Sequence, residues 1–257
     1  MELSKRLNAV ASLVTDGYRL ADIGTDHAYI PIRLIQTGRI PGAVAMDVNR
    51  GPLLRAEENI RLYGLEDKIV TRISDGFSAL KKNEADSAVI AGMGGPLTIR
   101  ILRDGAGTVT ALKECILQPQ SEIEKVRAFL LEEGFFFLSE DMVEEDGKYY
   151  PMMKVKPPET GYNVEEANRV KPPESARVAY SGESNADGWN EAELRYGKLL
   201  LKDNNPVLRE FLEREIRIRI RILDELKNNT SEKAAMRRKE LEKELEIAEK
   251  GMDYYAV

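Results

Sequence analysis

Cysteine and histidine are nearly absent from this sequence. Its 257 residues include one of each, Cys115 and His27. A single cysteine cannot form a disulfide within the chain, and one cysteine with one histidine offers too few ligands for a structural zinc site. We therefore expect a protein with no internal disulfide and no bound metal.

Long apolar runs are missing as well. No stretch approaches the roughly 18 consecutive apolar residues that a membrane-spanning helix needs. The chain does not begin with the basic and apolar pattern of a signal peptide. We expect a cytoplasmic protein with no membrane partner, and its length allows one or two domains with a substantial core.

The charge shows only a small excess of one sign, and it is unevenly distributed. The net charge is −6, yet residues 195–257 carry 15 basic and 13 acidic side chains, whereas residues 1–155 carry 19 and 23. Local patches, more than totals, decide whether a surface attracts phosphate. Composition alone therefore gives no evidence for a nucleic acid partner and does not exclude one.

Short apolar segments alternate with helical patterns in the first part of the chain. Strands are predicted at 18–23, 43–46, 68–74, 87–91 and 114–118, and helices at 2–14, 27–38, 51–63, 96–103 and 121–133. Two more strands, 135–143 and 148–155, flank Asp146-Gly147, a strong hairpin signal. This order predicts an α/β fold with a doubly wound, mostly parallel, Rossmann-like sheet.

The last third of the chain reads differently. Residues 157–190 contain the second copy of a Val-Lys-Pro-Pro-Glu repeat among Gly, Ser and Asn, which favours a connector, although a docking motif remains open. Residues 191–257 read as helical. We therefore expect three parts: a ligand-binding domain at 1–156, a connector at 157–190 and a helical domain at 191–257.

Within the helical part, residues 215–222 alternate isoleucine with charged residues, as a strand would. Apolar residues at 208, 212, 216, 220, 223 and 226 nevertheless keep helical spacing, so we expect one helix over 207–227. A turn with Ser231 as cap leads to a second helix at 232–250, which predicts an antiparallel hairpin or short coiled coil. Its arginines, Arg217, Arg219 and Arg221, fit either a solvated, ion-paired helix or an RNA-backbone surface.

A tight turn follows the first strand, and its residues indicate the kind of ligand. Asp22 is followed by Gly24 and then by Asp26, at the position where a dinucleotide fingerprint needs glycine for close approach to pyrophosphate. A carboxylate there repels phosphate and favours a cation. S-adenosylmethionine carries a sulfonium and an ammonium and no phosphate, so it fits this turn.

Acidic residues also follow the next two strands. Asp47, after the second strand, is placed to accept hydrogen bonds from ribose hydroxyls, and Asp75-Gly76, after the third, is placed to meet an adenine edge. Carboxyl ends of parallel strands share one edge of the sheet. The three acidic strand ends together predict a site for an adenosyl ligand with positive charge.

Five segments together resemble the bacterial tRNA 1-methyladenosine methyltransferases that act at tRNA position 22. The segments are 3–7, 21–31, 90–95, 116–119 and 144–148. The likeness covers the first 155 residues, whereas the helical tail is similar to the C-terminal coiled coil of that family only in pattern. The resemblance implies a class I methyltransferase fold, S-adenosylmethionine as donor and adenine N1 in tRNA as acceptor.

The candidate site residues follow from the strand ends and from this resemblance. Candidates for binding the cofactor are Arg6, Asp22, Gly24, Asp26, His27, Asp47, Val48, Asn49, Asp75, Gly76, Ala91, Gly92, Met93 and Gly94. Candidates for acting at the reacting base are His27, Tyr29, Met93 and Gln118. We expect Tyr29 to stack on the adenine and Gln118 to bind its edge. For His27, a ligand contact and a role within the turn backbone both remain open.

Adenine N1 has a free lone pair, so catalysis would consist mainly of aligning an extruded base. We expect tRNA as partner and a monomer. Two alternatives remain. One is a small-molecule methyltransferase, which would not need the helical hairpin. The other is a non-catalytic RNA-binding module, which would not need the three acidic strand ends.

Overall fold

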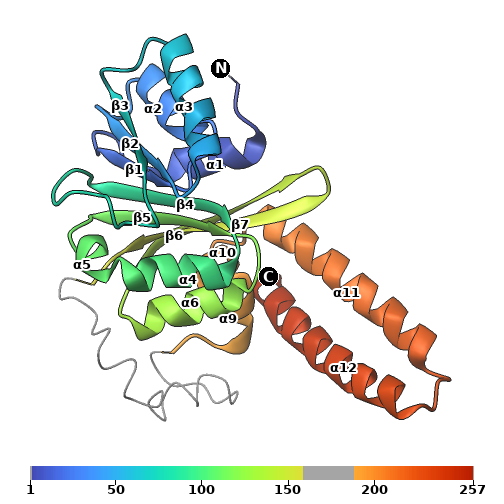
Figure 1. The fold of residues 1–257 in the computed structure, drawn as a ribbon. Helices are drawn as coiled ribbons and strands as arrows, with labels where there is room; N and C mark the ends of the chain where they lie inside the picture. The colour runs from blue at the N-terminus through green and yellow to red at the C-terminus, as the bar shows by residue number, and fades with distance from the viewer. Residues whose placement is uncertain (1, 159–187, 257) are drawn as a thin grey trace. The chain divides into compact units, whose positions relative to one another are not determined.

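The structure, a computed structural model, describes residues 2–158 and 188–256. Its contacts divide the chain into two units, Met1–Lys171 and Pro172–Val257, and each unit is described by itself (Figure 1). Most of the connector predicted at 157–190, including the second Val-Lys-Pro-Pro-Glu copy, lies outside the described residues. The three-part division of the chain therefore stays a prediction.

The first unit is built on one seven-stranded sheet. Its strands are β1 (Leu20–Ile23), β2 (Ala43–Asp47), β3 (Ile69–Ile73), β4 (Ser87–Met93), β5 (Glu114–Pro119), β6 (Phe136–Glu145) and β7 (Lys148–Lys156). Their order is β3-β2-β1-β4-β5-β7-β6; the first five are parallel, and β7 runs antiparallel to both neighbours. The mostly parallel sheet and the hairpin are thus confirmed. The winding reverses between β1 and β4, where open α/β sheets form their ligand crevice.

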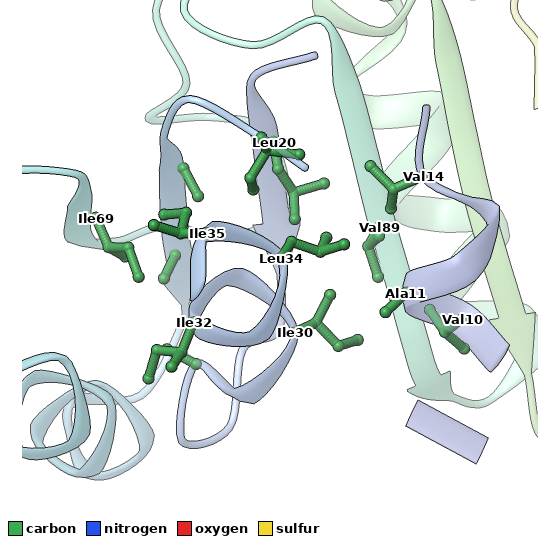
Figure 2. Close-up of a cluster of buried hydrophobic side chains, with 14 of the residues drawn as sticks. Val10, Ala11, Val14, Leu20, Ile30, Ile32, Leu34, Ile35, Ile69 and Val89 are labelled. Carbon is green, nitrogen blue, oxygen red and sulfur yellow. The ribbon is translucent and has the colours of Figure 1, made fainter. Parts of the chain in front are cut away.

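Helices cover both faces of this sheet (Figure 1). One set is α1 (Lys5–Leu13), α2 (Tyr29–Gln36) and α3 (Arg50–Leu62), and the other is α4 (Gly95–Asp104), α5 (Ala106–Val109) and α6 (Ile123–Glu132). Figure 2 shows how α1 and α2 pack against β1 and β4 through Val10, Leu34, Leu20 and Val89. Each of these four side chains is at most 1% exposed.

The inward face of α3 is narrower than the sequence pattern predicts. The sequence offers four apolar residues of this helix to the core, Leu53, Leu54, Ala56 and Ile60. Leu53, Ala56 and Ile60 are buried, whereas Leu54 is 46% exposed. Residues three and four apart share a helix face, whereas Leu54 follows Leu53 by a rotation of about 100°. The prediction that Leu54 belongs to the core is therefore wrong.

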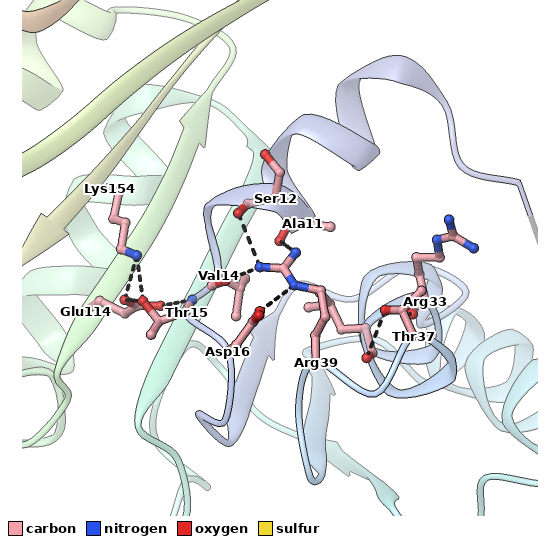
Figure 3. A network of polar contacts seen from close by, with 11 residues as sticks. Ala11, Ser12, Val14, Thr15, Asp16, Arg33, Thr37, Arg39, Glu114 and Lys154 are labelled. Carbon is pink, nitrogen blue, oxygen red and sulfur yellow. Dashed lines mark hydrogen bonds and ion pairs between the residues drawn. The ribbon is translucent and has the colours of Figure 1, made fainter.

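Arg39 closes the C-terminal end of α1 (Figure 3). Its guanidinium donates hydrogen bonds to the carbonyl oxygens of Ala11 and Val14 and forms an ion pair with Asp16. The last carbonyls of a helix have no partner within the helix, so a side-chain cation there satisfies them. This contact holds the end of α1 close to the loop that follows α2.

The same helix is tied to the sheet by a buried carboxylate (Figure 3). Glu114, at the start of β5, accepts hydrogen bonds from the backbone N–H of Thr15 at 2.9 Å and from the Thr15 hydroxyl at 2.6 Å. The ammonium of Lys154 lies 3.0 Å from its second oxygen. Buried charges are tolerated when they are paired and hydrogen-bonded. This network anchors α1, which carries Arg6 at its other end.

The second unit is helical. Its elements are α9 (Glu191–Tyr196), α10 (Lys198–Lys202), α11 (Pro206–Leu226), α12 (Glu232–Met252) and the short 3₁₀ helix η1 (Asp253–Tyr255). Helices α11 and α12 form the predicted hairpin (Figure 1). The Ser231 hydroxyl oxygen accepts a hydrogen bond from the backbone N–H of Ala234 at 3.3 Å, which confirms the predicted cap.

The face of α11 that packs on α12 contains a charged residue. Ile220 is 46% exposed, whereas Arg219 is 7% exposed. Arg219 lies 2.6 Å from Glu215, as the spacing predicts, and 3.1 Å from Glu244 of α12. Seven residues after the buried Leu212, position 219 returns to the same helix face, so the charged residue faces α12 and the isoleucine faces outward. The helical spacing of the apolar residues thus predicted the helix correctly, but it did not report which residue faces α12.

Candidate active site

The carboxyl ends of β1 and β4 open into one cavity of about 510 Å³. It lies at the point where the order of the strands reverses. Its lining residues are Arg6, Leu7, Asp22, Gly24, Thr25, Asp26, His27, Tyr29, Ile30, Asp47, Ala91, Gly92, Met93 and Gln120. Most of the predicted site residues are therefore brought together in one place, from the start of α1, the turn after β1 and the ends of β2 and β4.

The turn between β1 and α2 needs an unusual backbone. Gly24 has φ +74°, and a Cβ built on it would lie 2.0 Å from the Met93 methyl carbon. His27 and Ala28 also have positive φ, 64° and 53°. Such backbone costs a residue with a Cβ roughly 1–2 kcal/mol. The Asn59 side-chain amide supports the turn by donating to the His27 carbonyl oxygen at 3.0 Å.

His27 and Tyr29 present a stacked aromatic pair at the cavity. Their ring centroids are 4.9 Å apart and their planes differ by 7°. The neighbouring Asp26 carboxylate lies 3.5 Å from His27 Nε2 and 2.8 Å from the Arg55 guanidinium. The charge of Asp26 is thus shared with Arg55, so Asp26 is a weaker attractor of a cationic ligand than the sequence pattern suggests.

Two carboxylates form the acidic side of the cavity. Asp22 is buried, and this burial raises its pKa to about 6, against the opposing effect of a hydrogen bond from the Thr25 hydroxyl; the negative charge of Asp47 raises the pKa further. The Thr25 bond is 2.6 Å long. One Asp47 oxygen accepts from the backbone N–H of Asn49 at 2.6 Å, and in the described part of the chain no hydrogen bond reaches the other. That oxygen is available to a ligand hydroxyl.

Gln118 lies behind the cavity wall and is fully buried. Its side-chain oxygen accepts from the Arg6 guanidinium at 3.0 Å and from the Gly92 backbone N–H at 3.2 Å, and its amide nitrogen donates to the Pro119 carbonyl at 3.3 Å. Both ends of the amide are therefore occupied. An amide with both ends bonded in this way offers no free group to a base, and the contact of Gln118 with the adenine edge stays a prediction.

Several other predicted residues do not line this cavity. Asp75 and Gly76 line a second cavity of about 400 Å³ together with Phe77 and Ile101, and Asp75 forms an ion pair with Arg100 at 3.0 Å. The strand before them, β3, is at the edge of the sheet, with β2 and β1 between it and β4. Asp75 and Gly76 thus line a different cavity from Asp22 and Asp47, and their contact with an adenine edge stays a prediction.

Three further predicted residues also stand outside it. Val48 follows β2 and is 59% exposed, Asn49 is the residue before α3, and Gly94 is the residue before α4. These three positions shape the starts of helices. Their contacts with the cofactor stay a prediction.

The lining also contains residues that were not predicted, above all Thr25, Ile30 and Gln120. Thr25 and Ile30 belong to the same turn and helix as the predicted residues. Gln120 was missed because the predicted strand ended at Gln118, whereas β5 continues to Pro119. The first residue past the strand end, at the sheet edge, is therefore Gln120.

In residues 2–158 and 188–256, no group of three or more histidine, cysteine, aspartate or glutamate side chains is arranged to hold a metal ion. Within these same ranges, none of the helices combines the length and apolar character required to cross a membrane.

The fold and the cavity define the class of protein. A sheet that reverses at β1 and β4, with acidic residues and a glycine turn at this point, is an architecture for nucleoside-type ligands. A family model described as "Methyltransferase domain" matches residues 3–153. The chain belongs to this methyltransferase family.

Within this class, the similarity narrows to one group, which confirms the resemblance drawn from the sequence. The chain is 39% identical over 153 residues to the tRNA (adenine(22)-N(1))-methyltransferase of Bacillus subtilis (strain 168). That alignment covers 60% of this chain and 64% of the relative, which is less than two thirds of it.

Solved structures extend the similarity over nearly the whole chain. The crystal structure of the B. subtilis M1A22 tRNA methyltransferase has a TM-score of 0.74 and 30% identity, covering 98% of this chain and 99% of that chain. A Streptococcus pneumoniae protein crystallised with S-adenosyl-L-methionine has a TM-score of 0.76 and 29% identity, covering 98% and 100%.

Proposed function

We propose that this protein transfers a methyl group from S-adenosylmethionine to N1 of an adenine in tRNA, at position 22. The observation that carries this proposal is the cavity at β1 and β4, where Asp22 and Asp47 lie with the stacked rings of His27 and Tyr29. Carboxylates suit a cationic adenosyl donor, and aromatic rings suit a flat base. The similarity to the B. subtilis enzyme supports the choice of acceptor.

The residues of the cavity fit the donor. The unoccupied oxygen of Asp47 can accept hydrogen bonds from ribose hydroxyls, and Arg6 can bind the carboxylate of the methionine portion as a charge-assisted pair. Gly24 leaves room beside Met93 that a Cβ would fill. A cation bound near Asp22 favours its ionised form and lowers its raised pKa. When bound, the donor supplies a methyl group made electrophilic by its sulfonium.

Little proton transfer is required of the protein. The N1 lone pair of adenine forms the new bond to the methyl carbon while the carbon–sulfur bond breaks and its electron pair stays on sulfur. Positive charge moves from sulfur to the adenine ring. The residues therefore have to orient the base, exclude water and stabilise a cationic ring, for which Tyr29 and His27 offer a stacking surface.

The target base must first leave its place in the folded tRNA. Extrusion costs a few kcal/mol, which contacts elsewhere on the tRNA would offset. On α11, Arg217 and Arg221 are exposed, and Arg221 makes only a long, exposed ion pair of 4.0 Å with Glu225. Arg219, in contrast, is held by glutamates inside the hairpin. We assign the RNA-backbone contacts to Arg217 and Arg221 and exclude Arg219 from them.

One assay tests the function. The protein is incubated with labelled S-adenosylmethionine and unmodified bacterial tRNA, and the label is mapped; a tRNA with guanine at position 22 is the control. We expect label at N1 of adenine 22 and none in the control. Donor binding without transfer to any tRNA would indicate a small-molecule methyltransferase, and no donor binding would indicate a non-catalytic module.

A further inference from the structure

Gln120 is held at the cavity by its backbone while its side chain remains unbonded. It follows β5 directly, and its backbone N–H donates to the Met93 carbonyl oxygen at 2.8 Å. Its side chain lines the cavity. Within residues 2–158 and 188–256, its amide makes no hydrogen bond. A donor and an acceptor are thus presented to a ligand from a fixed position.

Gly92 lies beside this amide. A Cβ at Gly92 would lie 3.7 Å from the Gln120 amide nitrogen and 3.6 Å from the Arg6 guanidinium. The backbone there has φ +79°, which favours glycine. Arg6 and Gln120 therefore both lie close to one backbone position at the end of β4, and that position adds no side chain of its own.

The two glutamines near the end of β5 differ in what they can do. Gln118 is fully buried, and both ends of its amide are used to hold Arg6, Gly92 and Pro119. Gln120 is exposed, and its amide makes no hydrogen bond to any other described residue. A group that reads a ligand needs free hydrogen-bonding capacity, and of this pair only Gln120 has it.

We propose that Gln120 recognises the target adenine by its Hoogsteen edge, with its side-chain oxygen accepting from the N6 amine and its amide nitrogen donating to N7. This inference rests on the proposed function. Glutamine forms this two-bond contact with adenine. The contact leaves the N1 lone pair free to receive the methyl group. Guanine would place its O6 acceptor against the glutamine oxygen, so Gln120 selects adenine.

Gln118 has a different part in this proposal. It is a positioning residue that holds Arg6 and the Gly92 backbone, and through Arg6 it acts on the donor. Changes at the two glutamines should therefore separate: one affects the tRNA substrate and the other affects the affinity for S-adenosylmethionine.

The test uses tRNA with either adenosine or 7-deazaadenosine, which lacks N7, at the target position. Wild type should lose about tenfold in kcat/KM on the deaza substrate. Gln120→Leu should lose about tenfold on adenosine and show no further loss on 7-deazaadenosine, with the donor Kd within about twofold of wild type. A tenfold loss lies within the discrimination between bases that a two-bond contact typically provides.

Two controls accompany it. Gln36→Leu, at an exposed glutamine of α2 that lies outside the cavity lining, should behave as wild type on both substrates. Gln118→Leu should raise the donor Kd while remaining sensitive to the loss of N7, and Gln118→Glu, which keeps an acceptor for Arg6, should restore part of the donor affinity.

Two results would overturn the assignment while wild type is active: full activity of Gln120→Leu, or a deaza effect on Gln120→Leu equal to that on wild type. A wild-type protein that binds the donor but methylates no tRNA adenine would overturn the proposed function and this inference with it.

Discussion

The cavity and the helical hairpin use charged residues in opposite ways. In the hairpin, charges are paired with one another: Arg219 with Glu215 and Glu244, and Arg237 with Glu240. In the cavity, Asp22 is buried with a raised pKa, and Asp47 keeps one oxygen without a hydrogen bond from the described residues. Paired charges have little hydrogen-bonding capacity left for a ligand, whereas Asp22 and Asp47 in the cavity, like the exposed Arg217 of α11, keep some of theirs.

The two regions also differ in how their backbone is stabilised. The hairpin consists of regular helix with an apolar seam that includes Leu212, Leu241 and Ala248. The cavity is built on a turn with positive φ at Gly24, His27 and Ala28. Strain of this kind persists where the surrounding structure imposes it, often at functional sites. Variants of the cavity should therefore change ligand binding, and variants of the hairpin should change stability or RNA affinity.

The largest effect on this comparison should come from Gly24→Ala. The new Cβ would meet the Met93 methyl carbon at 2.0 Å, at a backbone φ of +74°, so the end of the Met93 side chain must move. Met93 lines the cavity, so its displaced end occupies space that the donor needs. A misplacement of about 1 Å can cost about a hundredfold in catalytic rate, and we expect the largest loss of donor affinity in this series, measured by calorimetry. Gly38→Ala is the matched control: its φ is +70° and no atom lies within 4 Å of the new Cβ. It should lower stability and leave donor affinity unchanged; equal losses in both variants would contradict the steric argument.

A smaller effect, about tenfold, should follow from pH. With the pKa of Asp22 raised to about 6, roughly a tenth of this carboxyl is ionised at pH 5 and most of it at pH 7. Donor affinity should therefore rise about tenfold between these values in titration calorimetry. Asp22→Asn should bind more weakly and lack this step.

The same group predicts how stability depends on pH. Between 3.8, the ordinary pKa of an aspartate carboxyl, and about 6, its pKa in the folded protein, the unfolded chain is ionised at Asp22 while the folded chain holds the proton. Stability therefore falls as pH rises through this window. Across this window the unfolding free energy of wild type should fall by on the order of 3 kcal/mol relative to that of Asp22→Asn. Melting temperatures of both proteins, measured at several pH values, check this. Parallel curves for the two proteins would refute the buried, protonated carboxyl.

In the hairpin, the double change Arg217→Ser with Arg221→Ser should weaken tRNA binding several-fold and leave the donor Kd unchanged. Each lost phosphate contact should lower the slope of log Kd against log salt by about 1. Binding measured at several salt concentrations checks this. The matched control is the double change Lys202→Ser with Arg61→Ser, which lies outside α11 and α12. An equal loss of tRNA affinity in this control would show that α11 has no special role.

The smallest effect should come from Ile220→Ala. Because this side chain is 46% exposed, we expect a change in unfolding free energy within about 0.5 kcal/mol. Leu212→Ala, at a fully buried position of the same helix, should cost roughly 2–5 kcal/mol. Thermal or urea unfolding measures both. A large loss of unfolding free energy in Ile220→Ala would show that this side chain is packed inside the hairpin.

Local patterns were sufficient for the element order. Apolar runs of strand length, glycines after helices and Asp146-Gly147 predicted the parallel sheet and its hairpin, because these signals act over a few residues. Helical spacing correctly prevailed over the alternation at 215–222, since α11 runs unbroken from Pro206 to Leu226. The acidic turn after β1 also located the cavity.

Side-chain partners could not be predicted in the same way. Asp75 was expected beside the ligand, but Arg100, 25 residues later, pairs with it. Gln118 was expected to touch a base, but Arg6, 112 residues earlier, takes its oxygen. Such partners are brought together only by the packed sheet and its helices, and no local spacing reports them.

The sequence by itself thus determined the strand–helix order, the helical hairpin and the acidic strand ends, because each follows from the chemistry of neighbouring residues. The tertiary structure decided which of those acids remain free, that Arg219 and not Ile220 faces α12, and that Gln120 and not Gln118 faces the cavity. The physical reason is that a side chain's remaining hydrogen-bonding capacity depends on residues distant in the chain, which meet it only when the fold closes.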